Sequence, residues 1–519
     1  MAGPATLSAR AKSLWAVYLI FLLAILYLVL LVSSSQTGVF FSSDGGIKYI
    51  VVKQFSEGHG FKYMYLPQPQ WVQETWDQGF FPFKPPFIYP SPQGRLFVFP
   101  PAFPIISSFF YSHWGNTGLY IIPVFSTLLL WLFFCIILRR CGVSSLYTAV
   151  ALFIMVFCSP LTIYGATFWE HMSAVLLLLS GLAYILFSGS RPSPDPAPAI
   201  WVGACMGLIS GLAAWFRPEA MAMNGLYGLA VLFLFIKERK TAHIAFIIGL
   251  TLSVGGFLIF NQVELGAWFG IHSYQVIREN DPSGMVTKGF KNLFSNNALS
   301  LKHFGYAILL LPVIYALLKY KKRLDIRVIL LTCIAVVFCL ATPFMVPNDG
   351  GRQWGARYFL PVIPVTLVVL AVVAQQWQPL ISRKWTTAFI AVLLFITGYS
   401  FYRNSYKGGI KTLRWENYNR IKPDLDFISS QKDEVVVVSL HYIAMELGYL
   451  FDKKYFFLAP DDNSLQKLQS LLKAHGVRGY TYVYDIRVPD NQPPMLKNMG
   501  LPVRTNERGD FYYEHYTIR

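Results

Sequence analysis

Leu14 to Val32 reads LWAVYLIFLLAILYLVLLV, an apolar run that contains no charged residue. A helix needs about 20 such residues to cross the hydrocarbon core of a bilayer, because each residue adds about 1.5 Å along the axis. The run is too long for the core of a signal peptide, and no obvious small-residue cleavage site follows it. It therefore predicts a signal anchor that is retained as the first transmembrane helix.

Apolar blocks of similar length recur along the chain. Of the 519 residues, 54% are hydrophobic and only 14% are charged, whereas soluble proteins carry about 25% charged residues. We therefore expect a mainly α protein, a polytopic membrane bundle of about eleven transmembrane helices. The predicted spans are 14–33, 117–138, 146–165, 170–187, 200–216, 219–236, 242–262, 304–319, 326–346, 357–374 and 385–402.

The orientation follows from lysines and arginines close to the ends of the apolar blocks. With the N-terminus in the cytoplasm, strict alternation places every compact basic cluster on the cytoplasmic side. The clusters are Arg10 with Lys12, Arg139–Arg140, Arg191, Lys237–Lys240, Lys319–Arg323 and Arg383–Lys384. Many of the basic residues behind the net charge of +17 thus lie in clusters that orient the helices in the membrane. Nucleic acid is therefore not an expected partner.

Three long polar regions then lie outside the cytoplasm: 34–116, 263–303 and the part after residue 402. We expect a membrane domain over 1–402, which includes the aromatic first outer loop 34–116 as interfacial pieces, and an extracytoplasmic α/β domain over 403–519. Its predicted elements are strands at Val435–Val438, Tyr480–Tyr484 and Phe511–Thr517 and an amphipathic helix over Ser464–Ala474. The outer regions contain no Cys, and we expect a bacterial inner membrane protein.

Asp44 lies in the first outer loop, shortly after the first apolar block. A carboxylate in this position is suited to act as a general base toward an acceptor hydroxyl or amine. It is also suited to cap a helix that would begin near Ile47. The two interpretations are compatible, because a cap would hold the carboxylate in place.

Glu170 and His171 open the predicted fourth span. A carboxylate next to a helix N-terminus is favoured by about 0.3–1 kcal/mol, which gives Glu170 a structural explanation. His171 is a possible ligand of a divalent metal, although one Glu-His pair is a weak signal.

Arginines occur in two short outer segments, where the topology bias disfavours them. Arg217 and Glu219 occupy the tight connection between the fifth and sixth spans, and Arg352 and Arg357 precede the tenth. Guanidinium groups bind phosphate oxygens in pairs, so these arginines are candidates for an anion site at the outer leaflet. The structural alternative is an ion pair with Asp349 or Glu219 for Arg352 and Arg357, and snorkelling of the side chain to the membrane surface for Arg217.

The order of parts resembles the GT-C superfamily of polytopic glycosyltransferases, which use polyprenyl-phosphate sugars. Three stretches carry the local resemblance: Ser43–Tyr49 (SDGGIKY), Phe216–Ala220 (FRPEA) and Gly351–Pro361 (GRQWGARYFLP). Many members have a second acidic residue beside the first, but Gly45 follows Asp44 here, so metal dependence is an open question.

The resemblance implies an inverting sugar transfer at the outer face of the membrane, with Asp44 as the general base. It implies that the donor phosphate is held by Arg217, Arg352 and Arg357, with help from Lys48. Glu170, His171 and Glu219 would line the site. The expected partners are a polyprenyl-phosphate sugar, membrane lipids and a glycan, lipid or protein acceptor, and a divalent metal is possible.

Other classes of protein fit the same pattern less well. An oligosaccharide ligase or polymerase that uses a lipid pyrophosphate would need the same cationic outer site. A lipid or oligosaccharide transporter or flippase would carry charges in the middle of its helices, whereas the charges here gather at the outer ends. A non-catalytic assembly subunit would tolerate the loss of the Asp44 carboxylate.

Overall fold

The structure is a computed structural model that describes residues 4–518 other than 36, 190–195, 272, 274–303, 321–324, 346–353, 356, 378–382, 486–503, 506–508 and 510. The chain divides into two compact units. One unit comprises Met1–Ser33 and Tyr120–Lys411, and the other comprises Ser34–Leu119 and Thr412–Arg519. Each unit is therefore assembled from two separate stretches of sequence.

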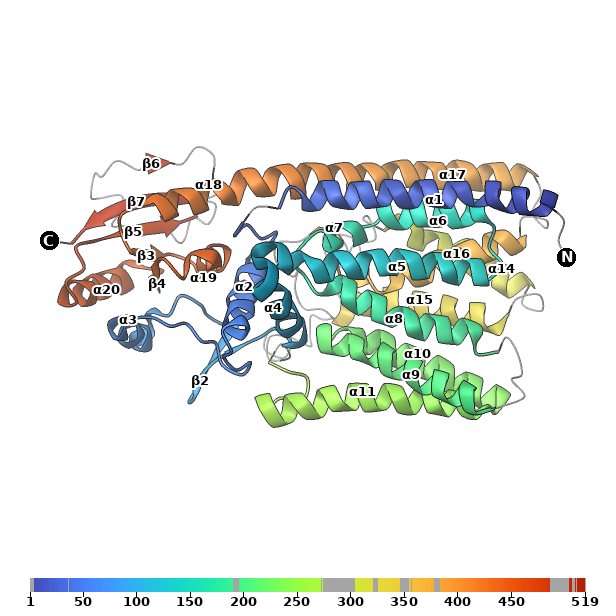
Figure 1. Ribbon diagram of the computed structural model, residues 1–519, viewed down its shortest axis with the longest axis horizontal. Coiled ribbons are helices and arrows are strands. Elements are labelled where there is room, and N and C mark those ends of the chain that lie inside the picture. Colours follow the sequence, from blue (N-terminus) through green and yellow to red (C-terminus); the bar gives the residue numbers. More distant parts are fainter. Residues whose placement is uncertain are drawn as a thin grey trace. The chain divides into compact units, whose positions relative to one another are not determined.

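The first unit is a bundle of helices (Figure 1). In chain order these are α1 (Pro4–Val32), α5 (Ile121–Arg140), α6 (Ser145–Phe157), α7 (Leu161–Gly165), α8 (His171–Phe187), α9 (Pro196–Phe216), α10 (Ala220–Glu238), α11 (Thr241–Leu265), η5 (Gly305–Leu309), α14 (Leu310–Tyr320), α15 (Ile326–Met345), η7 (Arg357–Phe359), α16 (Val362–Trp377) and α17 (Arg383–Phe401). Helix α1 packs against α6, α5 against α8, and α9 against α11. Figure 1 shows their axes running along a common direction.

Each predicted span overlaps at least one described helix of this bundle. Among the described residues, seven helical stretches are long and apolar enough to cross a membrane by length and composition. Helices α6, α8 and α16 and the stretch Gly305–Tyr315 are apolar but shorter. The prediction of a polytopic membrane bundle is confirmed.

The predicted span 146–165 is one place where the sequence pattern was too simple. Helix α6 ends at Phe157, and the separate short helix α7 begins at Leu161. Pro160 lies between them and cannot donate the backbone hydrogen bond that a continuous helix needs. The hydroxyl of Thr162 instead donates to the carbonyl oxygen of Val156 at 2.6 Å across this break.

The second unit contains a small α/β domain in the C-terminal part of the chain. Its sheet has the strand order β4-β3-β5-β7-β6, with β3 (Val435–Val438), β4 (Tyr455–Leu458), β5 (Gly479–Tyr484), β6 (Arg504–Thr505) and β7 (Tyr512–Thr517). Strand β3 pairs in parallel with both neighbours, and β7 runs antiparallel to β5. The helices are α18 (Asn417–Ser430), α19 (His441–Glu446), η9 (Gly448–Leu450) and α20 (Asp462–Ala474). The predicted α/β domain is confirmed.

The first outer loop belongs to this second unit. It forms α2 (Ser43–Ser56), α3 (Gln70–Thr75), η1 (Trp76–Phe80), the hairpin of β1 (Ile88–Ser91) and β2 (Gly94–Phe97), α4 (Ala102–Trp114) and η2 (Gly115–Tyr120). Val72, Trp76 and Phe80 are buried in the same core as Val437 and Phe457. Burial of these aromatic side chains joins the loop to the core of the C-terminal domain.

The expected domain boundary after residue 402 falls inside a continuous helical segment. Helix α17 is followed without interruption by η8 (Tyr402–Glu416) and then by α18. The turns of η8 are wider than those of an α-helix. The division between the two compact units falls at Lys411, within η8.

Candidate functional site

Asp44 lies in the first turn of α2, which begins at Ser43. The helix therefore starts earlier than the sequence pattern indicated, and Asp44 is not its cap, because Ser42 holds that position. A carboxylate in the first turn is stabilised by the partial positive charge of the helix N-terminus. The side chain of Asp44 is partly exposed, so the carboxylate remains accessible to a reactant.

The two glycines after Asp44 allow α2 to pack closely within the second unit. A Cβ atom on Gly46 would lie 1.7 Å from the carbonyl oxygen of Met445 in α19, and one on Gly45 would lie 2.6 Å from Cβ of Phe40. Helix α2 packs against α19, η9 and α4. Gly45 and Gly46 thus have a packing role, which fixes the position of the helical turn that carries Asp44.

Lys48 lies one turn after Asp44, on the same face of α2. Only 2% of its surface is exposed, and its Nζ atom lies 4.6 Å from the centre of the Phe99 ring. Helix α19 begins with His441, whose pKa is lowered by burial and, to a smaller extent, by the charge of Lys84. The imidazole is therefore neutral near pH 7. Lys48 is the first basic residue after Asp44 on α2.

A second group of charges lies in the helical unit, where Arg217 follows α9. Its guanidinium donates to Oε1 of Glu170 at 2.9 Å and to Oε1 of Glu219 at 2.6 Å. The side chain of Glu170 is 2% exposed, whereas that of Glu219 is 31% exposed. Two carboxylates thus hold the guanidinium of Arg217 in place.

Arg357 lies beside a layer of aromatic rings in the same unit. It is 7% exposed, donates to the hydroxyl of Tyr358 at 2.8 Å, and its guanidinium carbon lies 5.4 Å from the centre of the Trp169 ring. The rings of Tyr164, Trp169 and His171 contact one another, with centroid distances of 5.2 Å for Tyr164 and Trp169, 4.9 Å for Trp169 and His171, and 4.8 Å for Tyr164 and His171. Both Arg217 and Arg357 are within electrostatic range of Tyr164.

The structure brings together five of the predicted residues within one unit. Glu170, His171, Arg217, Glu219 and Arg357 form one group around Tyr164 in the helical unit, whereas Asp44 and Lys48 lie on α2 of the other unit. Arg352 lies outside the described residues. The aromatic members Tyr164, Trp169 and Tyr358 were not singled out from the sequence, because aromatic residues are common throughout this chain.

A divalent metal site would need several His, Cys, Asp or Glu side chains close together. Within the described ranges, no group of three or more His, Cys, Asp or Glu side chains is arranged to hold a metal ion. The His171 ring is packed face to face with Trp169. These residues do not assemble a metal site, and no step proposed below uses one.

The membrane-length helices among the described residues, together with a second unit built around a small sheet, define an integral membrane protein. By sequence, the chain matches no protein-family model and no curated protein. By structure, it is similar to ArnT from Cupriavidus metallidurans bound to undecaprenyl phosphate, with a TM-score of 0.57 and 13% identity over 96% of this chain and 97% of that chain. The apo form of the same protein matches with a TM-score of 0.53 and 15% identity over 96% and 97% of the two chains. The likeness establishes the fold.

Proposed function

We propose that the chain is a glycosyltransferase that moves a sugar from a polyprenyl-phosphate donor to an acceptor at the outer face of the membrane. The fold carries the proposal, because it extends over 96% of this chain and is shared with a protein crystallised with undecaprenyl phosphate. A polyprenyl tail stays in the bilayer, so an enzyme that uses such a donor benefits from a helical bundle of this kind. The membrane is a bacterial inner membrane, with the N-terminus in the cytoplasm.

Asp44 acts as the general base in this proposal. Its carboxylate takes the proton of the acceptor hydroxyl or amine as that atom attacks the anomeric carbon from the side opposite the phosphate. The bond between the anomeric carbon and the phosphate oxygen breaks, and polyprenyl phosphate leaves with the bonding electrons. Attack from the opposite face inverts the configuration. The support from the structure is the rigid placement of Asp44 in the first turn of α2.

Arg357 is a candidate for stabilising the leaving phosphate. The guanidinium of Arg217 pairs with the carboxylates of Glu170 and Glu219. Arg357 lies among the rings of Trp169 and Tyr358, where its charge is poorly solvated. Charge that develops on the phosphate is stabilised most by a donor already fixed in a poorly solvated place. We assign Lys48 and Arg352 supporting roles, and Glu170, His171 and Glu219 the lining.

Transport is less well supported than transfer. A transporter is expected to carry ionisable groups near the middle of its helices. In the described part of the helical unit, the ion pairs lie at helix ends. Arg217 directly follows α9, and Glu238, the last residue of α10, pairs with Arg327 near the start of α15.

The direct test is transfer of radiolabelled sugar from a mixed pool of polyprenyl-phosphate sugars by the full-length protein in lipid nanodiscs. We expect Asp44→Asn to reduce the rate at least 100-fold, the size of a typical general-base contribution, while donor binding is retained. Glu57→Gln is the matched control, because it removes a carboxylate from the opposite end of α2. Equal rates for Asp44→Asn and wild type would remove Asp44 from the mechanism. No transfer by wild type with any donor and acceptor would favour transport or assembly.

A further inference from the structure

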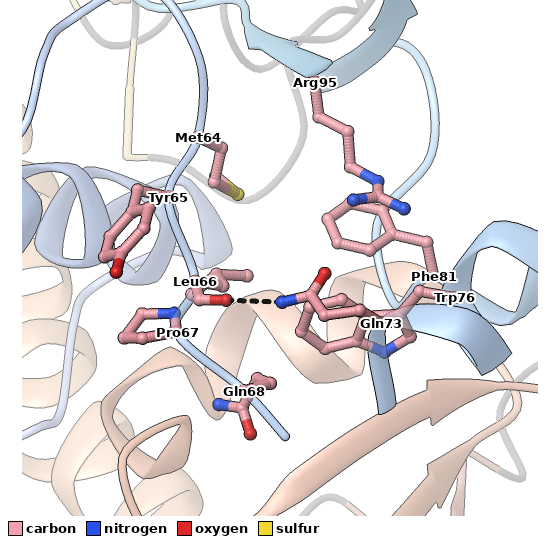
Figure 2. Close-up of a pocket in the computed structure, with 9 residues that line it drawn as sticks. All are labelled: Met64, Tyr65, Leu66, Pro67, Gln68, Gln73, Trp76, Phe81 and Arg95. Atoms are coloured by element: carbon pink, nitrogen blue, oxygen red, sulfur yellow. Dashed lines mark hydrogen bonds between the residues drawn. The ribbon is translucent and has the colours of Figure 1, made fainter. Parts of the chain in front are cut away.

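The first outer loop forms an open pocket of about 350 Å³ within the second unit. Ligand sites for small molecules typically begin near this size, at about 300 Å³. Figure 2 shows the segment from Met64 to Gln68 on one side of the pocket and Phe81, Trp76 and Arg95 on the other. The lining comes entirely from residues 64–95, so none of the residues proposed above for the reaction belongs to it.

One wall of the pocket carries a positive charge on an aromatic support. The guanidinium carbon of Arg95 lies 4.0 Å from the centre of the Phe81 ring and 5.8 Å from that of Trp76. Its other partner is Asp77, at 2.8 Å, whose side chain is 73% exposed. An ion pair with so exposed a carboxylate is weak, because water screens it. Arg95 is therefore held in place while its charge remains largely available to a ligand.

The opposite wall is fixed by hydrogen bonds to both neighbouring elements. The backbone N–H of Met64 donates to the carbonyl oxygen of Arg95 at 2.8 Å. The N–H of Tyr65 donates at 2.8 Å to Gln54, a buried residue of α2. Gln73 donates its amide N–H to the carbonyl oxygen of Leu66 at 2.8 Å, which Figure 2 shows as the bridge across the pocket. The shape of the pocket is thus formed before any ligand binds, which lowers the entropic cost of binding.

The lining combines polar and apolar groups. Arg95 is the one charged residue among the described lining residues, and Gln68 and Gln73 share the lining with apolar side chains such as Leu66 and Phe81. A pyranose ring combines the same two kinds of group, with apolar C–H faces and a rim of hydroxyls. An oxyanion on the ring would meet the guanidinium in a charge-assisted hydrogen bond.

We propose that this pocket binds one sugar residue that carries an oxyanion, either a carboxylate or a phosphate, as part of the acceptor. The assignment to the acceptor rests on the function proposed above. Asp44 and Gln54 are ten positions apart on α2, which is about 15 Å along the helix axis. The pocket therefore recognises a part of the acceptor remote from the reacting hydroxyl, where binding energy helps to orient the substrate.

The test is saturation-transfer NMR with the full-length protein in nanodiscs, using methyl glucuronide, glucose 6-phosphate and methyl glucoside as probes. We expect at least one anionic sugar to bind about tenfold more tightly than the neutral glucoside, which is the lower range for a charge-assisted hydrogen bond. The anion that binds more tightly identifies the oxyanion. Failure of all three to bind at millimolar concentration would overturn the proposal.

Two variants separate binding from structural support. Arg95→Gln and Asp77→Asn each remove the same ion pair, so a purely structural role predicts that both weaken binding. We expect Arg95→Gln to lose the preference for the anion, and Asp77→Asn to strengthen anion binding severalfold because the guanidinium loses its competing carboxylate. If both variants change the affinity for the anionic sugar in the same direction, while their thermal unfolding is unchanged, the proposal is overturned.

The readout is independent of sugar transfer. Asp44→Asn should retain full binding of the anionic sugar, because Asp44 does not line the pocket. If the pocket binds the sugar but wild type transfers none from any donor, the pocket stands as a saccharide site and the transferase proposal fails. If wild type transfers sugar but the pocket does not bind the anionic sugar, the transferase proposal stands and the pocket proposal fails.

Discussion

At the scale of single residues, Gly46 allows α2 to pack closely against α19. A Cβ atom here would lie 1.7 Å from the backbone oxygen of Met445, and a backbone atom cannot move aside as a flexible side chain can. We expect Gly46→Ala to lower the free energy of unfolding of the second unit by more than the about 1–3 kcal/mol typical of overpacking. Thermal unfolding followed by tryptophan fluorescence measures the change. Gly60→Ala is the control, since nothing lies within 4 Å of the added atom; equal melting temperatures for the two variants would contradict the argument.

Arg217 and Glu170 form a buried pair whose roles can be separated by a double-mutant cycle. Removal of Arg217 alone would leave Glu170, 2% exposed, without this ion pair, and breaking a buried pair costs about 3–5 kcal/mol. We expect Arg217→Gln to destabilise the protein by an amount in this range and Glu170→Gln to restore part of it in the double variant. Thermal unfolding in detergent measures the cycle.

The same cycle tests the part of Arg217 in donor binding. If Arg217 held the donor phosphate, the double variant would recover stability but not affinity for undecaprenyl phosphate. We expect both to recover, because the two carboxylates already occupy this guanidinium. If stability recovers but affinity for undecaprenyl phosphate does not, Arg217 binds the donor phosphate.

At the scale of elements, α9 and α11 approach each other through glycines at four-residue spacing. Cβ atoms added to Gly203 and Gly207 of α9 would lie 2.3 Å and 2.0 Å from backbone oxygens of α11, and one added to Gly249 of α11 would lie 2.1 Å from a backbone oxygen of α9. Small residues at this spacing allow membrane helices to pack backbone to backbone. The pair is thus held by packing that larger side chains would prevent.

Gly207→Ala is therefore expected to destabilise the bundle by about 1–3 kcal/mol. The matched control is Gly225→Ala in α10, where nothing lies within 4 Å of the added atom and a helix gains up to about 1 kcal/mol from alanine. Melting temperatures in the same detergent compare the two. A stable Gly207→Ala variant would show that α9 and α11 separate readily.

The sequence predicted the helices of the bundle because an apolar run of membrane length is a local property. The same reasoning missed the break at Pro160, since the apolar count of the block is unaffected by a proline. It also placed the start of α2 too late, because Gly45 and Gly46 are poor helix formers in isolation. Packing of α2 against α19 outweighs that preference, and no local pattern reports it.

At the scale of the whole molecule, the composition of the second unit depends on contacts between distant parts of the chain. The indole N–H of Trp76 donates to the carbonyl oxygen of Phe456 at 2.8 Å, across 380 positions of sequence. Aromatic residues in the first loop therefore complete the core of the C-terminal domain, which no window of sequence could indicate. The candidate site shows the same limit. The unusual location of Arg217 was visible in the sequence, but its pairing with Glu170, 47 positions away, was not.

The orientation of the chain across the membrane is also a property of the whole molecule. The positive-inside bias places Lys237 in the cytoplasm and the C-terminal domain, including the exposed Ser470 of α20, outside it. In a variant whose native cysteines are replaced, we expect Ser470→Cys to react with a membrane-impermeant maleimide in intact, outer-membrane-permeabilised cells. Lys237→Cys, the matched control at the end of α10, should react only after lysis. The reverse pattern would invert the whole chain and would place Asp44 on the cytoplasmic side, where an acceptor in the cell envelope could not reach it.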